Sequence, residues 1–334
     1  MFWRGRLKGK QSNITFFIFG ILLFTSSVGF VGFGELLQAP VQKNNSFVIH
    51  KRLPIFFEHY GKIKKLQNSS VSETADIKGY FESQSSKLNP LPEYSRLVAP
   101  IFIWRLPKDL KGIAKVNHRK KIFISLLLPL LIRHNIAITQ KRSSVKILIE
   151  KPISSLSIDE YNWLVKTALH YKIFDESISK PIITKEILKE LLNRIDIIPV
   201  SLALAQSSLE TGWGTSRFSI DGNALFGQWT WKTNKGIRPK QRALGTKHSV
   251  LRFSHLAESI EDYTHNLNSS SHYRSFRSKR SALRKADYPI DIWAQNLVKE
   301  LKKYSSNSEH YILTIKSIIR ENQLTDFDNY SLSP

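Results

Sequence analysis

The sequence of 334 residues contains no cysteine, which excludes disulfides, thiolate metal sites and a cysteine nucleophile. Acidic residues are also scarce. The 27 aspartates and glutamates stand against 50 lysines and arginines, and the formal net charge is +23. So basic a chain favours anionic partners such as nucleic acid, acidic lipid head groups or a cell-wall polymer, although a general drift of composition toward lysine would produce the same charge.

Several catalytic and binding motifs are missing as well. The histidines form no HExxH or other paired zinc pattern, and the sequence has neither a GxSxG motif nor a glycine-rich loop for phosphate. We therefore expect no metal and no cofactor. Motifs for reading a nucleic-acid groove or a single strand are also lacking, so nucleic acid is not the expected partner.

The first 37 residues combine a basic start with a long apolar stretch. Four lysines and arginines lie between residues 4 and 10, and the most apolar part follows at 14–33. This is roughly the 20 residues that span a bilayer as a helix, whereas secretory apolar segments are shorter. The pattern predicts an N-terminal transmembrane helix with a cytoplasmic start and the rest of the chain exported. Cleavage of this segment as a signal stays open.

Periodicity and composition then predict a mainly helical α+β fold. Apolar residues at three- and four-residue spacing predict helices over 157–171, 184–194, 256–267, 290–304 and 310–320, and one from Pro199 that stops at Gly212 and Gly214. Ser157 and Glu160 form a capping box at the start of the first of these. The run at 122–132 is too short to cross a bilayer and predicts a buried helix bent at Pro129, and 224–254 predicts a small β-hairpin.

These features divide the chain into five parts. We expect a basic N-terminus and membrane anchor or signal at 1–37, a polar spacer at 38–96, a helical region packed on the catalytic domain at 97–156, the catalytic domain at 157–322 and a tail at 323–334.

Glu210 is the carboxylate that the sequence singles out. It lies in the last turn of the apolar helix that starts at Pro199, where the partial negative charge of the helix end disfavours a carboxylate. Apolar neighbours such as Leu209 and Trp213 would raise its pKa further by excluding water. Both effects favour the protonated form that a general acid needs. The alternative is a partly solvated glutamate followed by an ordinary glycine cap.

The segments AQSSLETGWGTSRFS and NALFGQW resemble the Ala-Gln-x-x-Leu-Glu-Ser/Thr-Gly-Trp-Gly … Asn-x-Leu-Phe-Gly signature of the endo-β-N-acetylglucosaminidase family. This is glycoside hydrolase family 73, which includes the muramidase domain of flagellar peptidoglycan hydrolases. GQWTW, GIRPKQR and HSVLRF look closer still to its membrane-associated Bax-type members. The resemblance is strong over 199–253 and weaker over about 95–322. It implies a lysozyme-like fold, with a glycan cleft between a helical lobe and a small β-lobe.

The resemblance also implies roles for particular residues. Glu210 would be the general acid that protonates the oxygen of the β-1,4 bond after N-acetylglucosamine in peptidoglycan. Tyr288 would lie opposite Glu210 as a second catalytic group. The residues expected to bind substrate or line its cleft are Trp213, Asn223, Gln228 and Tyr263, with Tyr273 as a weaker candidate. The implied partners are peptidoglycan strands and, through the N-terminal helix, the bacterial inner membrane, with the catalytic domain in the periplasm. The oligomeric state stays open.

A second catalytic carboxylate is missing where the family draws one from the β-lobe. Residues 222–257 contain no aspartate or glutamate, and 248–250 read His-Ser-Val where close relatives would have His-Glu-Val. Glycosidases usually place a second carboxylate about 5–5.5 Å from the first for retention or about 6.5–9.5 Å for inversion.

Three interpretations remain for the second group. Asp221 could enter the cleft, or Glu258, Glu261 or Asp262 could reach it from the following helix. Otherwise the substrate's own acetamido group attacks, which needs no second carboxylate and is the interpretation we favour. A site with one glutamate could also give anhydro-sugar products, as lytic transglycosylases do. The rival hypothesis from another class is a catalytically silent protein that binds glycan or acts as a scaffold.

Overall fold

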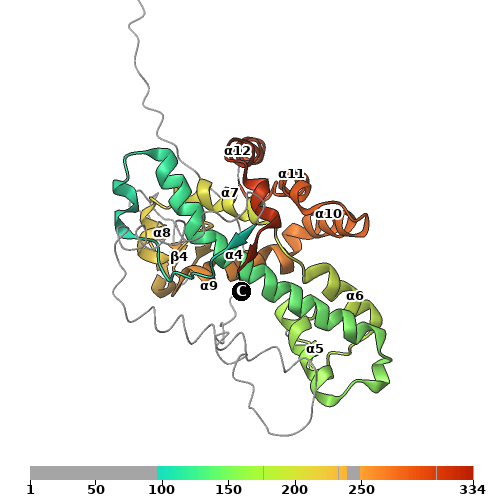
Figure 1. Ribbon diagram of the computed structural model, residues 1–334. Coiled ribbons are helices and arrows are strands. Elements are labelled where there is room, and N and C mark those ends of the chain that lie inside the picture. Colours follow the sequence, from blue (N-terminus) through green and yellow to red (C-terminus); the bar gives the residue numbers. More distant parts are fainter. Residues whose placement is uncertain (1–95, 176, 232, 239–248, 306, 334) are drawn as a thin grey trace, which may run out of the picture.

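The computed structural model describes residues 96–334 except 176, 232, 239–248, 306 and 334. This part of the chain is mainly helical with two small sheets, which confirms the predicted helical class (Figure 1). The predicted membrane helix at 14–33 and nearly all of the predicted spacer lie outside the described residues.

The described part of the chain consists mainly of helices, with short strands among them. The α-helices are α4 Val116–Glu150, α5 Ile158–His170, α6 Lys185–Arg194, α7 Val200–Thr211, α8 Arg217–Gly222, α9 Leu256–Ser269, α10 Arg274–Lys285, α11 Trp293–Leu297 and α12 Ser308–Glu321. The 3₁₀ helices are η2 Lys108–Gly112, η3 Ile153–Ser155, η4 Thr233–Lys235, η5 Ser271–Tyr273, η6 Ile290–Ile292, η7 Val298–Glu300 and η8 Leu324–Asn329. The strands are β1 Leu97–Val98, β2 Trp229–Thr230, β3 Gly236–Ile237, β4 Ser249–Leu251 and β5 Ser331–Leu332.

Helix α4 crosses the molecule and takes part in two separate cores (Figure 1). Its apolar residues up to Ile132 belong to a first core with α7 and α9–α12, and those from Ile138 onward belong to a second core with α5 and α6. It is the only described helix long and apolar enough to cross a membrane, but more than half of its most apolar stretch is buried in the protein. It is therefore a core helix, three times longer than the predicted 122–132 run and with Pro129 inside it.

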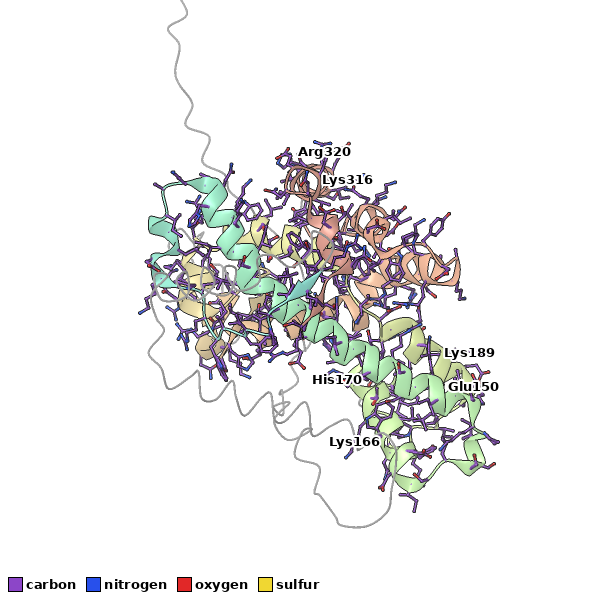
Figure 2. The ribbon with its side chains drawn as sticks, viewed as in Figure 1. Glu150, Lys166, His170, Lys189, Lys316 and Arg320 are labelled. Carbon is purple, nitrogen blue, oxygen red and sulfur yellow. The ribbon has the colours of Figure 1, made fainter. Side chains whose placement is uncertain are left out.

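The second core builds a lobe at one end of the molecule. Figure 2 marks Glu150 and Lys189 at its outer end and Lys316 and Arg320 on α12, away from it. The capping box predicted for α5 is confirmed, since Ser157 Oγ accepts from Glu160 N and Glu160 Oε2 accepts from Ser157 N. Thr184 likewise caps α6. These two caps fix where the helices of the second lobe begin.

Helix α7 is buried on all sides of its first nine residues and packs against α4, α12 and η8. Its polar side chains are tolerated there because hydroxyls such as Ser207 and Ser208 donate to Leu204 O. Pro199 is the N-cap, and Gly212 ends the helix in the left-handed region with φ 57°. The sequence predicted both ends, and the second of them places Glu210 in the last turn.

The predicted hairpin is a three-stranded antiparallel sheet in the order β2-β4-β3. β4 lies in the middle, and Val250 is the register partner of both Trp229 and Ile237. A second sheet, which the periodicity did not indicate, pairs β1 with β5 in parallel. Two-residue strands leave too short an alternation for a sequence pattern to detect.

Two further expectations need correction. The helix expected over 290–304 is broken into η6, α11 and η7, because the chain tightens into 3₁₀ turns and closes at Leu301. Apolar spacing alone does not distinguish these successive turns from one helix. The segment expected as a tail, 323–334, is part of the fold. Its η8 packs on α7, and Asp328 accepts from Ser201 N (2.9 Å) and Ser201 Oγ (2.5 Å).

Candidate active site

Glu210 is partly buried in the last turn of α7. Burial raises the pKa of its carboxyl group to about 7, and a hydrogen bond with the Tyr311 hydroxyl opposes that rise. The direction of this shift and its cause, burial, agree with the argument made from the sequence. The carboxyl group therefore stays protonated up to about neutral pH.

The backbone after α8 closes tightly over the Glu210 carboxyl group. Gly227 has φ 65°, and a Cβ at this position would lie 2.9 Å from Glu210 Oε2. The neighbouring carbonyl of Phe226 accepts a hydrogen bond of 3.0 Å from the Tyr304 hydroxyl. Gly227 thus lets the main chain approach the acid, and Tyr304 holds it there.

A chain of hydrogen bonds orients the hydroxyl that contacts the acid. Tyr263 Oη donates to Gln206 Oε1 (2.7 Å), and Gln206 Nε2 donates to Tyr311 Oη (2.8 Å). Because Tyr311 accepts from Gln206, its own proton is left to donate to Glu210. Gln206 lies four residues before Glu210 on the same face of α7, so one helix carries both the acid and the residue that orients its partner.

Four tyrosines, which we call the phenol cluster, lie within electrostatic range of one another: Tyr263, Tyr273, Tyr304 and Tyr311. The charge of Glu210 acts on three of them, Tyr273, Tyr304 and Tyr311. The Tyr304 and Tyr311 rings stack at 5.4 Å, and the Tyr273 ring lies 6.4 Å from that of Tyr304. Burial raises the pKa of Tyr273, Tyr304 and Tyr311, and the Glu210 charge raises them further. The phenols therefore remain protonated donors at all ordinary pH values.

Trp213 and Asn223 have mainly structural surroundings. The Trp213 ring meets that of Phe123 edge-on at 6.0 Å and carries Lys120 Nζ 4.8 Å from its centroid, so one of its faces is already covered. Its φ of 58° is rare for a bulky residue. Asn223, at the end of α8, is 1% exposed, and its Nδ2 donates to Phe253 O (3.0 Å).

Gln228 adjoins the wall formed by Gly227 and links it to α9. Its Nε2 donates to Ser259 O (3.2 Å), and its side chain is hydrogen-bonded to Asp262. Burial raises the pKa of Asp262 to about 6, against the opposing effects of Lys172 and of this hydrogen bond. Asp262 is therefore the α9 carboxylate connected to the loop that covers the acid.

The other proposed second carboxylates have different surroundings. Glu258 lies in the first turn of α9 after the His255 N-cap, and its Oε2 accepts from Ser254 N (2.6 Å). Burial raises the pKa of Glu261 to about 7, and the charge of Lys141 opposes that rise. Asp221 is exposed at the end of α8. None of the described carboxylates perturbs the pKa of Glu210, as a carboxylate within about 4–6 Å would.

Tyr288 lies in the turn before η6. It is 52% exposed, and its carbonyl accepts from Trp293 Nε1 (2.9 Å). The phenol of Tyr288 is not among the groups that act on the pKa of Glu210, and its expected place opposite the carboxyl group stays a prediction. The phenols on which the Glu210 charge acts are those of Tyr273, Tyr304 and Tyr311.

Sequence reasoning missed Gln206, Tyr304 and Tyr311. A signal for Gln206 was present, because it stands in the Ala-Gln-x-x-Leu-Glu segment four residues before the acid. Tyr304 and Tyr311 fall on the apolar faces of expected helices, where an aromatic residue is indistinguishable from a core residue. Among the described residues, no group of three or more His, Asp or Glu side chains could hold a metal ion.

Comparisons with known proteins agree with this geometry. A family profile described as mannosyl-glycoprotein endo-β-N-acetylglucosaminidase, or glucosaminidase, matches residues 185–324. The chain is also 33% identical over 289 residues to Protein bax of Escherichia coli strain K12, an alignment that covers 86% of this chain and 97% of that protein. The chain belongs to the glucosaminidase family. The glucosaminidase match begins at the first residue of α6, so it includes α7, the small sheet and the phenol cluster and leaves α4 and α5 outside it. No solved structure matches the chain.

Proposed function

We propose that this protein is a peptidoglycan hydrolase that cleaves the β-1,4 bond after N-acetylglucosamine, with Glu210 as the general acid. The observation that carries the proposal is the surroundings of Glu210, a carboxyl group kept protonated to about pH 7, bound by Tyr311 and covered by Gly227 within a glucosaminidase domain. A group of this kind can give a proton to the oxygen of a glycosidic bond at neutral pH.

The reaction we propose uses the substrate's acetamido group as nucleophile. Its carbonyl oxygen forms a bond to C1 while the bond from C1 to the leaving oxygen breaks, and Glu210 gives its proton to that oxygen. Water then attacks C1 of the cyclic intermediate, the acetamido group is restored, and the proton of the water returns to Glu210. No described carboxylate perturbs the pKa of Glu210. This supports the acetamido route over a retaining mechanism, which needs a second carboxyl group about 5 Å from the first.

Asp262 offers the alternative route by direct attack of water. It is joined through Gln228 to the loop at Gly227, and it is the α9 carboxylate with the best connection to the acid. A base in that place would activate water on the opposite side of the sugar and invert the anomeric centre. The stereochemistry of the first product decides between the two routes.

Two further functions have specific support. A single glutamate without a paired carboxylate is also compatible with a lytic transglycosylase, which gives anhydro-muramic ends. A silent glycan-binding or scaffold protein is favoured by the stretch 222–257, which has no aspartate or glutamate. The intact relay from Tyr263 through Gln206 and Tyr311 to Glu210 favours an enzyme, because glycan binding alone needs no oriented acid.

The proposed site of action is the periplasmic face of the bacterial inner membrane. This rests on the basic start and the apolar stretch 14–33, which have the composition of an uncleaved membrane anchor. A fusion of a periplasm-active reporter after residue 95 should be active, and the chain should sediment with membranes. Recovery of the whole chain in the soluble fraction would contradict the anchor.

Mass spectrometry of purified peptidoglycan incubated with the full chain tests the activity, beside the Glu210→Gln variant. Reducing N-acetylglucosamine ends from the wild type, absent with the variant, are the expected result. Anhydro-muramic ends would identify a transglycosylase. Intact glycan with both proteins, each folded and bound to the polymer, would contradict an enzyme and favour the scaffold.

A further inference from the structure

Tyr273 has the one hydroxyl of the phenol cluster for which the described residues offer no hydrogen-bond partner. Its side chain is 0% exposed, and its ring lies 6.4 Å from that of Tyr304. The other three hydroxyls are engaged, Tyr263 with Gln206, Tyr304 with Phe226 O, and Tyr311 with Gln206 and Glu210. A buried hydroxyl without a partner is unfavourable and calls for an explanation.

The position of Tyr273 supplies that explanation. It lies in η5 and packs beside Tyr304, which stacks on Tyr311, the tyrosine bound to the acid. The negative charge of ionised Glu210 acts on the Tyr273 phenol and raises its pKa, so the two groups lie within electrostatic range. The hydroxyl without a partner therefore lies within electrostatic range of the one group whose charge changes in the proposed reaction.

We propose that Tyr273 is a positioning residue, whose hydroxyl donates a hydrogen bond to the Glu210 carboxylate formed when the acid has given up its proton. This inference rests on the proposed function of Glu210. In its protonated form, Glu210 has a hydrogen bond with Tyr311 alone. The ionised carboxylate accepts further donors, and a buried carboxylate needs them because water cannot supply them.

The effect on the reaction follows from the order of events. Negative charge develops on Glu210 as its proton moves to the leaving oxygen, and a donor that binds only the charged form lowers the barrier without strengthening substrate binding. Tyr273→Phe should therefore lower kcat by about tenfold, the smaller effect expected for a hydrogen bond to a charged group, and leave KM nearly unchanged. It should also make the acid harder to ionise in the free protein.

Carbon-13 NMR titration of the full chain in detergent micelles tests this directly. Glutamate carboxyl groups are labelled, and the Glu210 signal is assigned by its loss in Glu210→Gln. In Tyr273→Phe the titration midpoint of Glu210 should rise by about one pH unit, corresponding to a tenfold change in its ionisation equilibrium. Tyr330→Phe, which removes a hydroxyl outside the phenol cluster, should leave the midpoint unchanged.

A second substitution distinguishes an effect of the Tyr273 hydroxyl from an effect on folding. Difluorotyrosine at position 273 keeps the ring and makes the hydroxyl a stronger donor, so the Glu210 midpoint should fall, opposite to the change in Tyr273→Phe. An unchanged Glu210 midpoint in both variants overturns the inference, even if kcat falls. A wild type that releases no glycan ends contradicts the proposed function instead, while the two opposite midpoint shifts would still establish the Tyr273–Glu210 hydrogen bond.

Discussion

At the scale of single residues, the site depends on a carboxyl group that its surroundings keep uncharged. Burial at the end of α7 raises the pKa of Glu210 to about 7. Between its ordinary pKa and about pH 7 the folded protein therefore binds a proton that the unfolded chain has released. Folding stability falls as pH rises through this window, because ionising the buried acid is unfavourable. The position that makes Glu210 a usable acid thus costs stability.

Glu210→Gln should remove that cost. We expect its free energy of unfolding to exceed that of the wild type by about 1–3 kcal/mol at pH 8, less than the full shift implies because the group is only partly buried. The difference should vanish near pH 4, where Glu210 is protonated in both states. Urea unfolding at the two pH values measures it. Equal stability of variant and wild type at pH 8 would show that Glu210 is not desolvated.

Gly227→Ala tests the contact between the loop and the acid. The new Cβ would lie 2.9 Å from Glu210 Oε2 on a backbone with φ 65°, so the carboxyl group or the loop must move. We expect a loss of about 1–2 kcal/mol in stability and a fall in glycan cleavage of at least about tenfold, because the acid is displaced. Gly112→Ala is the matched control, since its Cβ would meet nothing within 4 Å. Equal cleavage by both variants would contradict the contact.

Sequence alone singled out Glu210 but not the groups around it. Glu210 was singled out by local features, namely a helix end, a glycine stop and an apolar run, and by the family-like segment that contains it. The phenol cluster comes from α9, η5, the turn after η7 and α12, up to about a hundred residues later, and only tertiary packing brings Tyr304 and Tyr311 to the carboxyl group. The role expected for Tyr288 stays a prediction.

At the scale of elements, α10 shows why periodicity fails where the buried face is charged. The helix was not predicted, because Arg277 and Arg280 occupy positions that face the core and are 1% and 0% exposed. Arg280 Nη1 donates to Asn268 Oδ1 (2.6 Å) and Asp196 O (3.1 Å). Arg284 pairs with the Asp196 carboxylate at 2.6 Å. These bonds replace the apolar contacts that a pattern search counts.

Arg280→Ala should therefore destabilise the fold strongly. It removes five hydrogen bonds to acceptors on α6, α9 and the segment after α6. Asp196 O and Arg194 O keep other donors, Asn268 Nδ2 and Asp196 N, but the remaining acceptors lose the Arg280 bond. We expect a loss of about 3–5 kcal/mol in the free energy of unfolding. Lys279→Ala, at the exposed neighbouring position, should change stability by less than about 0.5 kcal/mol. Similar denaturation midpoints for the two variants would contradict a structural role for the arginine network.

At the scale of the whole molecule, the two cores share one continuous helix. Composition predicted a boundary at 156/157, which no observation tests, whereas the packing divides α4 between the cores at about 132–138. No cap or break in the sequence marks this division, because α4 continues as one helix through the change. The family profile begins only at α6, so it does not describe α4 or α5.

The shared helix predicts that the lobes unfold together. Leu126→Ala in the first core and Leu164→Ala in the second should each lower stability by about 2–5 kcal/mol. Both should shift a single transition, with tryptophan fluorescence and far-ultraviolet circular dichroism coincident in each variant. A separate early transition in Leu164→Ala alone would show that the second lobe is an independent unit.

Because α4 runs without interruption from one core to the other, it fixes how the two lobes are rotated relative to each other about the helix axis. A helix turns by about 100° and advances about 1.5 Å for each residue. One residue inserted or deleted between Ile132 and Ile138 would therefore swing the second lobe around the helix axis. The bonds from Arg194 to Ser269 O and from His265 to His170 O, which join the lobes, would lose their partners. Seven residues, close to two full turns, would nearly restore this relative rotation but move the lobe outward by about 10 Å. The length of the segment between the cores is therefore constrained, and so are some of its side chains, since Asn135 Nδ2 donates to Ile198 O (2.8 Å) and the Arg133 guanidinium lies over the Phe102 ring.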